Sequence, residues 1–288
     1  MSTLVFLAVD VATVSLTSDD RVLAESIVAA GSEAVPVVWG ERLPPASTLV
    51  IRSTWDYVED PDRFVSWLSE LDAGGVVVHN PTSLLRWNLH KRYLVDLIRL
   101  GVPTVPTVVV SQGDDVDVGA LMRSNGWEDA VIKPVIGGTA RLAVHVDAIG
   151  TDAAQHHLDD LLAVEDAIVQ RFVPSVPAVG ETSVIAIAGV VTHAVHKRAT
   201  AGDWPVQAEF GGSCEPVAVD GRLAAAARNA IAAVQPTPAY ARVDLVEGPT
   251  GELQLIELEL VEPELFLRLA AHAATRLAHH ILPRGSVH

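Results

Sequence analysis

Charged residues alternate with apolar residues along the segment YARVDLVEGPTGELQLIELELVEPELF, from Tyr240 to Phe266. The segment is typical of two strands joined by a Gly-Pro turn. Alternate residues of a strand share a face, so Arg242 and Asp244 would lie together on the first strand. Glu257 and Glu259 would share a face of the second strand, with Ile256, Leu258 and Leu260 on its other face. If the strands pair, three carboxylates and one guanidinium meet on one surface.

This convergence suggests a magnesium–nucleotide site. Burying like charges together is costly unless a cation or hydrogen bonds compensate them. Magnesium chooses oxygen ligands and takes one or two carboxylates together with substrate phosphates. The alternative interpretation is a half-solvated hairpin whose acids face water.

Two lysines elsewhere could meet the phosphates of a nucleotide. Lys133, in VIKPVIGGTARLAVHV, ends an apolar strand before a Gly-Gly-Thr turn. Glycines let backbone N–H groups approach phosphate closely, and lysine adds a point charge. The P-loop ending G-K-[ST] is absent, so a hairpin turn with a surface lysine is the alternative. Lys91, in WNLHKRYL, stands near a helix start, where a single lysine is usually solvated.

Further charged residues lie at strand ends. Lys197 and Arg198 end a predicted strand, and adjacent strand residues point to opposite faces, so one of them would line a site. Arg52 and Asp56 follow a strand in IRSTWDYV. The carboxyl ends of strands in open α/β sheets bind ligands, and Arg52 could hold a substrate carboxylate through its two-pronged guanidinium. A salt bridge between Arg52 and Asp56 is the alternative.

Composition excludes several classes of protein. Hydrophobic residues make up 49% and charged residues 19%, as in a well-packed enzyme. The formal net charge of −16 opposes binding to nucleic acid. No apolar run approaches the ~20 residues that span a bilayer, and no signal peptide opens the sequence. The single Cys214 and the spacing of the histidines favour neither a disulfide framework nor a metal cluster. We therefore expect a cytoplasmic protein without a membrane partner.

The first hundred residues alternate between strand and helix patterns. Strands are predicted over 4–9, 34–38, 48–51 and 76–78. Asp19 or Asp20 would cap the first helix, whose apolar stripe is Val22, Leu23, Ile27 and Val28, and Pro61 would begin the second. Such alternation predicts a parallel sheet covered by helices. No G-x-G-x-x-G follows the first strand, which disfavours dinucleotide binding.

The remaining chain predicts two further lobes. Residues 82–100 favour one helix, and 101–110 a connector. Predicted elements after it are strands near 130–133, 142–146 and 167–173, a helix over 152–162, a hairpin over 181–198 that turns at Ala188-Gly189, and a helix over 222–234. A final helix would carry Phe266, Leu269, Ala273 and Leu277. The predicted domains are 1–100, 101–172 and 173–288.

The order of these motifs resembles the ATP-grasp superfamily over nearly the whole chain. Within it, the chain is similar to the O-ureido-serine cyclo-ligase group of D-cycloserine biosynthesis. The residues behind this resemblance are RSTWDY from Arg52, NLHKRYL from Asn88 and IELELVEPELF from Ile256. It implies an α/β fold of three lobes, with ATP held between the sheets of the central and C-terminal lobes.

The resemblance also implies roles for individual residues. ATP would be held by Lys91 and Lys133, a flap of Gly137, Gly138 and Thr139, an adenine hinge of Gln170, Phe172 and Val173, and Glu181 at the ribose. Arg242, with Lys197 or Arg198, would face the transferring phosphoryl group. Asp244, Glu257 and Glu259 would hold Mg²⁺, and Arg52, Trp55 and Asp56 the substrate. Two positions depart from the superfamily, because many members have glutamate at Gln170 and most have asparagine at Glu259.

The implied reaction activates a carboxylate. ATP converts it to an acyl phosphate, and a nitrogen of the same molecule then attacks, an arrangement in which proximity contributes ~7–11 kcal/mol. The implied substrate is the amino-acid-like O-ureido-D-serine. The alternatives are an intermolecular carboxylate–amine ligase, a nucleotide-binding protein without catalysis, and an α/β binding protein with solvated acids. A homo-oligomer is compatible with all of them.

Overall fold

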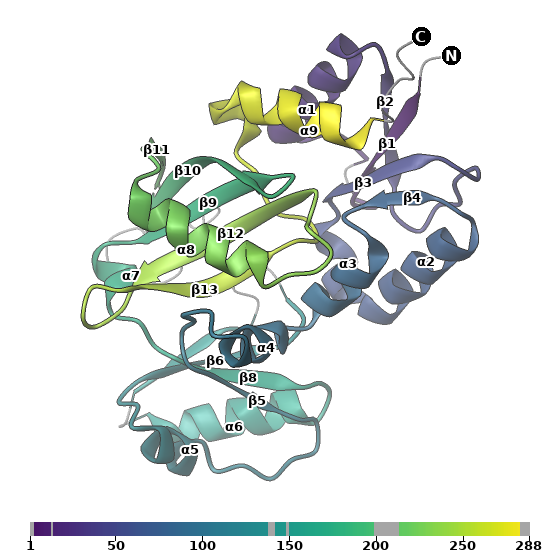
Figure 1. Cartoon of the computed structure of the whole chain (residues 1–288). Helices are drawn as coiled ribbons and strands as arrows, with labels where there is room; N and C mark the ends of the chain where they lie inside the picture. Colours follow the sequence, from purple (N-terminus) through teal and green to yellow (C-terminus); the bar gives the residue numbers. More distant parts are fainter. Residues whose placement is uncertain (1–2, 13, 138–141, 148–149, 199–212, 283–288) are drawn as a thin grey trace.

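Three sheets, one in each lobe, make up the molecule (Figure 1). The computed structural model describes residues 3–12, 14–137, 142–147, 150–198 and 213–282. The predicted fold class is confirmed: a parallel four-stranded sheet comes first, and two antiparallel sheets follow. Each sheet falls within one of the predicted domains, whose limits stay a prediction.

The N-terminal sheet has the strand order β2-β1-β3-β4. Its strands are β1 (Leu4–Val9), β2 (Glu33–Val38), β3 (Thr48–Ser53) and β4 (Val77–His79). Helix α1 (Ser18–Ala29) lies between β1 and β2, and the 3-10 helix η1 (Trp55–Glu59) and α2 (Pro61–Ala73) lie between β3 and β4, whereas β2 leads to β3 without a helix. Pro61 begins α2 as predicted, because its fixed φ suits the first helical position.

Two expectations for α1 were wrong. Thr17 caps the helix by accepting a hydrogen bond from the Asp20 backbone. The side chain of Asp20 is drawn away to Arg52, with Arg52 Nε 2.8 Å from Asp20 Oδ1. Leu23 and Ile27 are buried as predicted, but Val28 is 59% exposed because it lies beyond the edge of the buried stripe.

Residues 82–100 form two helices where one was predicted. They are α3 (Thr82–Leu89) and α4 (Tyr93–Arg99), and His90 between them is extended. A hydrogen bond from Lys91 N to Val135 O, 2.9 Å long, joins the break to the central lobe. Both helices pack into a core shared with the C-terminal sheet. Contacts between lobes therefore overrode the helical pattern.

The central lobe contains the sheet β5-β8-β6-β7. Its strands are β5 (Thr107–Val110), β6 (Ala130–Pro134), β7 (Val144–Val146) and β8 (Ala167–Arg171), and its helices are α5 (Val118–Asn125) and α6 (Thr151–Leu162). The predicted connector ends in β5. The strand expected from residue 142 begins at Val144, since Leu142 has a left-handed φ of 53°.

The C-terminal lobe contains the sheet β11-β10-β9-β12-β13. Its strands are β9 (Glu181–Ile187), β10 (Val190–Arg198), β11 (Ser213–Val217), β12 (Tyr240–Glu247) and β13 (Leu253–Glu259). The short α7 (Ser175–Ala178) precedes the sheet, and α8 (Gly221–Ala232) covers one of its faces. The predicted turn between β9 and β10 is confirmed: Ala188 and Gly189 both have positive φ.

The last helix is shorter than predicted. It is α9 (Ala271–Ile281), preceded by the 3-10 turn η3 (Leu267–Leu269). Ala273 and Leu277 are buried as expected, whereas Phe266 has a left-handed φ of 51° and Leu269 is exposed. In Figure 1 α9 lies beside α1, and both helices contribute to one core with the N-terminal end of β12.

Buried polar side chains fasten the N-terminal lobe to β12 and β13. Asn80 donates to Tyr240 O and Leu260 O, and Asn88 donates to Leu258 O. The Tyr240 hydroxyl lies within hydrogen-bonding distance of three carbonyl oxygens, those of Ile51, His79 and Val261. These bonds fix the position of β13 relative to the N-terminal lobe.

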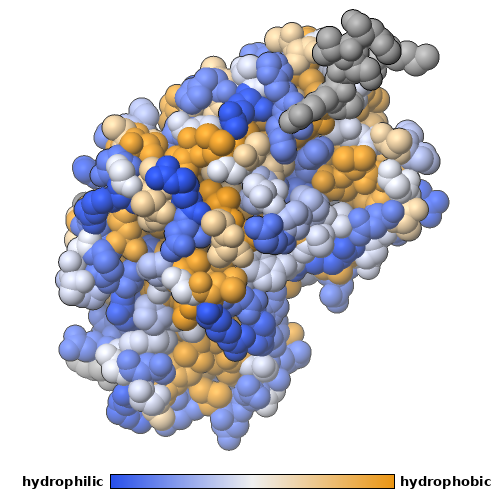
Figure 2. Space-filling model, viewed as in Figure 1, coloured by the Kyte–Doolittle hydropathy of each residue, from blue (hydrophilic) through white to orange (hydrophobic). Residues whose placement is uncertain are grey.

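The visible surface is mixed in character. Figure 2 shows apolar patches interspersed with hydrophilic residues on each lobe. Within the described residues, no helix is both long and apolar enough to cross a membrane.

Candidate active site

The predicted hairpin brings its charged residues together on one face. Arg242 on β12 stands opposite Glu259 on β13, and Asp244 stands opposite Glu257. The neighbouring strand β9 places Ser183 beside Asp244. The period of two thus aligns these side chains on one surface.

A bulge in β13 corrects one detail of the prediction. Asp244 pairs with Glu257 but Leu245 pairs with Leu255, so Ile256 is an extra residue. A bulge changes the alternation by one residue. Leu258 and Leu260 join the core under α8, while Ile256 packs against a separate cluster that includes Val105, Val173 and Val246.

Each predicted metal ligand is paired with a cation. Glu257 forms an ion pair with Lys91, and Glu259 with Arg242. Arg242 also contacts Asp244, with its Nη2 3.0 Å from Oδ2. Lys91 lies between α3 and α4, whereas the other residues are on β12 and β13. The structure therefore brings together predicted charges that are far apart in the sequence.

Lys197 joins the same network. It pairs with Glu181 and lies 3.6 Å from Asp244 Oδ2, and its side chain is buried. Arg198, the next residue, is exposed. This difference follows from the alternation of side chains along β10. Of the two predicted cations, Lys197 therefore lies on the charged face of the sheet, the surface that carries Glu181, Arg242, Asp244, Glu257 and Glu259.

Electrostatics separate the two neighbouring glutamates. Burial would raise the pKa of Glu257, but Lys91 and Lys133 outweigh it and lower that pKa to about 2. Burial raises the pKa of Glu259 to about 7, against the opposing effect of Arg242 and with the help of Glu257. Burial also lowers the pKa of Lys133. The positive charge of Lys91 adds to this shift, and the negative charge of Glu257 opposes it. Lys133 therefore faces the same group of charges from β6.

Ser183 is a site residue that the sequence analysis missed. It is fully buried, and its hydroxyl donates to Asp244 Oδ1 at 2.5 Å. The signal was present in the sequence, because Ser183 shares the face of Glu181 two residues earlier. Ser183 donates to Asp244 Oδ1, and Arg242 donates to both carboxylate oxygens of Asp244.

The predicted substrate residues lie in different surroundings. Arg52 is buried and pairs with Asp20 and, at 3.9 Å, with Asp19, which rules out the alternative pairing with Asp56. Asp56 instead accepts hydrogen bonds from Trp39 Nε1 and the Val11 backbone. Trp55 is 43% exposed. Its indole reaches Glu262 O, 3.3 Å away, just beyond β13.

The predicted adenine hinge lies on β8 and after it. Gln170 is buried, and its amide donates to Thr107 Oγ1 at 3.0 Å. The Phe172 ring lies 4.0 Å from the His145 ring, centroid to centroid, and Val173 is buried. Of the predicted flap, Gly137 is described, whereas Gly138 and Thr139 lie outside the described residues.

The donor chemistry of the charged face suits Mg²⁺, since Asp244, Glu257 and Glu259 offer only hard oxygen atoms. No three acidic or histidine side chains in the described residues are grouped closely enough to hold an ion by themselves. Lys91 and Arg242 occupy the carboxylates instead. The oxygen atoms of these acids therefore fit an ion whose remaining ligands come from a bound molecule.

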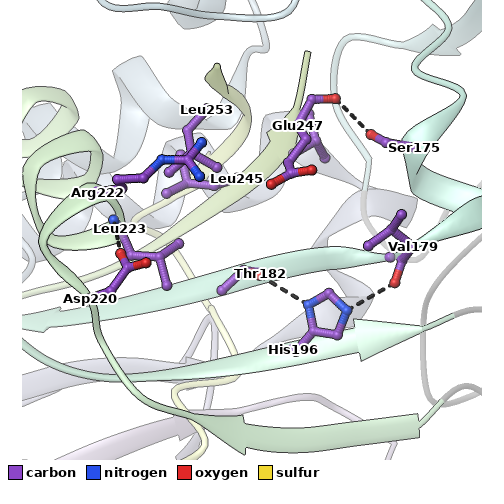
Figure 3. A pocket seen from close by; sticks show the side chains of 12 residues that line it. Ser175, Val179, Thr182, His196, Asp220, Arg222, Leu223, Leu245, Glu247 and Leu253 are labelled. Atoms are coloured by element: carbon purple, nitrogen blue, oxygen red, sulfur yellow. Dashed lines mark hydrogen bonds between the residues drawn. The ribbon is translucent and has the colours of Figure 1, made fainter. Parts of the chain in front are cut away.

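A pocket of about 170 Å³ lies on the reverse face of the sheet (Figure 3). Thr182 and His196 line it, and they alternate along the strands with Glu181 and Lys197 of the charged face. His196 is held on both ring nitrogens, by Thr182 Oγ1 and Val179 O. The pocket is thus separated from the charged face by the sheet itself.

The arrangement of sheets and charges defines an ATP-grasp ligase. Solved structures agree on the fold: a Bacillus anthracis D-alanine–D-alanine ligase superimposes with a TM-score of 0.65 at 14% identity, covering 97% of this chain and 96% of that one. The crystal structure of the D-cycloserine synthetase DcsG matches with a TM-score of 0.85 at 29% identity, over 96% of this chain and 98% of that one.

Sequence comparison gives the family. The profile of the DcsG N-terminal domain matches residues 5–80. The cycloserine biosynthesis protein DcsG of Streptomyces lavendulae is 31% identical over 254 residues, 82% of each chain. The chain therefore belongs to the DcsG family of ATP-grasp ligases.

Proposed function

We propose that this protein uses ATP to activate the carboxylate of O-ureido-D-serine and cyclises it to D-cycloserine. One observation carries the proposal: Lys91, Lys133, Lys197 and Arg242, from separate segments, gather around the acids of β12 and β13. Phosphoryl transfer requires such an arrangement, because cations stabilise the negative charge of the phosphates and acids hold the metal ion. Membership of the DcsG family supports this choice of substrate. We also propose a cytoplasmic location, where ATP is supplied.

The binding roles follow the predicted ones. Lys91 and Lys133 would turn from Glu257 toward the nucleotide phosphates, and Gly137 to Thr139 would cover them. Gln170, Phe172 and Val173 would border the adenine, and Glu181 the ribose. Asp244, Glu257 and Glu259 would hold Mg²⁺, which neutralises phosphate charge when bound.

The first step transfers the γ-phosphoryl group to a carboxylate oxygen and releases ADP. Negative charge spreads over the transferring group, and Arg242 and Lys197 stand where they would stabilise it. Both cations are already fixed by Asp244, so little rearrangement is needed to aim them. Exclusion of water would protect the acyl phosphate from hydrolysis.

The second step closes the ring. The oxygen-linked nitrogen of the ureido group attacks the acyl carbon, and phosphate leaves. The five-membered ring forms readily because nucleophile and electrophile belong to one molecule. Hydrolytic loss of the carbamoyl group from that nitrogen then gives D-cycloserine.

The test measures ADP release with O-ureido-D-serine, its L-isomer, and ordinary amino acids singly and in pairs. We expect O-ureido-D-serine to be turned over without a second substrate, and the other compounds of the panel not to be turned over. The mass of the product should equal that of D-cycloserine. Turnover only with paired amino acids would replace the proposal with an intermolecular ligase.

A second measurement separates catalysis from binding alone. Thermal unfolding is followed with ATP, with and without Mg²⁺, since a ligand of the folded state raises Tm. We expect a larger rise with both together. A rise without ADP release for any substrate would favour a non-catalytic nucleotide-binding protein.

A further inference from the structure

Glu262 is held at the seam between two lobes, beside the charged face. It follows β13 by three residues, and its main-chain oxygen accepts the hydrogen bond from Trp55 Nε1. Its carboxyl group interacts with the hydroxyl of Tyr57, which is buried in the N-terminal lobe. Both aromatic residues belong to η1, so one short helix of the N-terminal lobe contacts both the main chain and the side chain of Glu262.

Glu262 is the acid that the ion pairs leave out. Glu181, Asp244, Glu257 and Glu259 each pair with a lysine or an arginine. Glu262 has no such partner within the described parts of the chain. The nearby cations Lys91 and Arg242 act on it electrostatically, but other carboxylates already bind them.

A carboxylate in this position is under electrostatic strain. Burial and the neighbouring Glu259 raise the pKa of Glu262 to about 8, and the weaker effects of Tyr57, Lys91 and Arg242 do not reverse this. The free protein therefore keeps a proton on this carboxyl group at neutral pH, and a cation bound beside it would lower that pKa and stabilise the ionised form. The site therefore favours one additional positive charge at this point.

The surroundings suit an organic ammonium group better than a metal ion. A divalent metal needs several oxygen ligands, and the oxygen groups identified near the Glu262 carboxyl are the Tyr57 hydroxyl and the carboxylate of Glu259, which Arg242 already binds. A carboxylate beside aromatic rings is a typical receptor for ammonium groups. Trp55 is 43% exposed, so part of its ring is open to a ligand.

We propose that Glu262 binds the α-ammonium group of an amino-acid substrate, with Trp55 and Tyr57 placing it. The inference rests on the proposed function and deepens it, because it assigns the residue that recognises the ammonium group of the amino-acid substrate. The ammonium and carboxylate groups of such a substrate share one carbon atom. An ammonium at Glu262 would place the carboxylate toward Arg242, which pairs with Glu259 three residues earlier.

The experiment compares the wild type with Glu262→Gln on two substrates. One is O-ureido-D-serine, and the other is 3-(ureidooxy)propanoate, which lacks only the ammonium group. We expect the wild type to prefer the amino acid by about 100-fold in kcat/KM, the size of a charged hydrogen bond. In Glu262→Gln that preference disappears, mainly through a higher KM for the amino acid, while the KM for ATP is unchanged.

Glu264→Gln is the matched control. Glu264 lies two residues further along and pairs with Arg268, so its loss should leave the preference intact. Tm values of both variants show whether they fold. A preference that survives in folded Glu262→Gln overturns the inference, and so does a fall in kcat with unchanged KM for the amino acid.

The two proposals fail in different ways. If the wild type does not turn over O-ureido-D-serine but uses another amino acid, the proposed function is wrong, and Glu262 is tested on that amino acid and its form without the ammonium group. If the wild type uses simple carboxylic acids equally well, the role of Glu262 is wrong and carboxylate activation stands.

Discussion

The two faces of the C-terminal sheet are built from the same strands and have opposite characters. Under α8, residues such as Val184, Val243 and Leu258 form a continuous apolar core with Ala227 and Ile231. On the other face, Ile185, Ile187 and Val195 form an apolar core with residues of the N-terminal lobe and of α9. Further along the strands this face becomes charged, from Lys197 and Glu181 to Asp244 and Glu257.

The difference separates stability from chemistry. The apolar face supplies burial, which is the main favourable contribution to folding. The charged face concentrates buried ion pairs, which are weak evidence for stability because desolvation opposes them. We therefore expect changes on the charged face to affect mainly activity, and changes on the apolar face mainly stability.

The largest expected effect is on the charged face, in Glu257→Gln. Activity should fall by ~1000-fold or more, because the variant removes the charge that Lys91 and Lys133 face and that would hold Mg²⁺. The amide keeps the side-chain volume, so Tm should shift by only a few degrees. ADP release and thermal unfolding measure the two effects.

Glu252→Gln is the control for this prediction. Glu252 lies in the exposed turn of the same hairpin, where it accepts hydrogen bonds from Thr250. It should keep full activity. Full activity in Glu257→Gln would remove Glu257 from the site.

On the apolar face, Leu258→Ala should reverse this pattern. Leu258 is 1% exposed between the two charged positions of β13, and its truncation leaves a cavity. We expect the free energy of unfolding to fall by ~2–5 kcal/mol in urea titrations. The activity of each folded molecule should change little. Leu269→Ala, at an exposed position, should cost much less stability, and a loss of kcat without loss of stability in Leu258→Ala would break the comparison.

A smaller effect is expected at Ser183, which is uncharged but lies on the charged face. Ser183→Ala removes the hydrogen bond to Asp244 and should lower kcat about 10-fold, with about 1 kcal/mol lost in stability. The Mg²⁺ concentration needed for half-maximal activity should rise, since Asp244 is less well oriented. Thr182→Ala, on the reverse face of the same strand, should leave that concentration unchanged. Equal effects of both variants would argue against a positioning role for Ser183.

The smallest effect concerns the boundary of the N-terminal lobe. Burial lowers the pKa of His79 to about 4, and nearby His280 reinforces the shift. Between pH 6.5 and about 4 the unfolded chain binds a proton that the folded chain does not, so stability is lost as pH falls through this range. The ring is partly exposed, so solvent screening should reduce the loss to about 1 kcal/mol or less. Urea unfolding at pH 7 and pH 5 measures it, and His79→Gln should remove this part of the pH dependence.

Periodicity predicted the charged face well, but not its partners. Arg242, Asp244, Glu257 and Glu259 could be placed on one surface because strands alternate strictly. The bulge at Ile256 was not predictable, because an inserted residue leaves no mark in the alternation until the strands are paired. The ion pair of Arg52 was not predictable either, because its partner Asp20 lies on a helix far from it in sequence.

Helix limits were the weakest predictions. The stretch 82–100 has a continuous helical pattern, yet it breaks at His90, where Lys91 is tied to the central lobe. Phe266 and Leu269 fit the spacing of the final helix but precede it. In both cases tertiary contacts outweigh local helix propensity, which is worth less than 1 kcal/mol per residue for ordinary residues.

The sequence by itself determined the three lobes, the paired acidic strands and the presence of enough cations to meet a nucleotide. These properties depend on local alternation and on residue type, which a linear chain displays directly. Tertiary structure decided which cation meets which acid, that Lys197 rather than Arg198 enters the cluster, and that Glu262 is left without a cationic partner in the described chain. Such pairings depend on distances between segments, and those distances are set only when the lobes pack together.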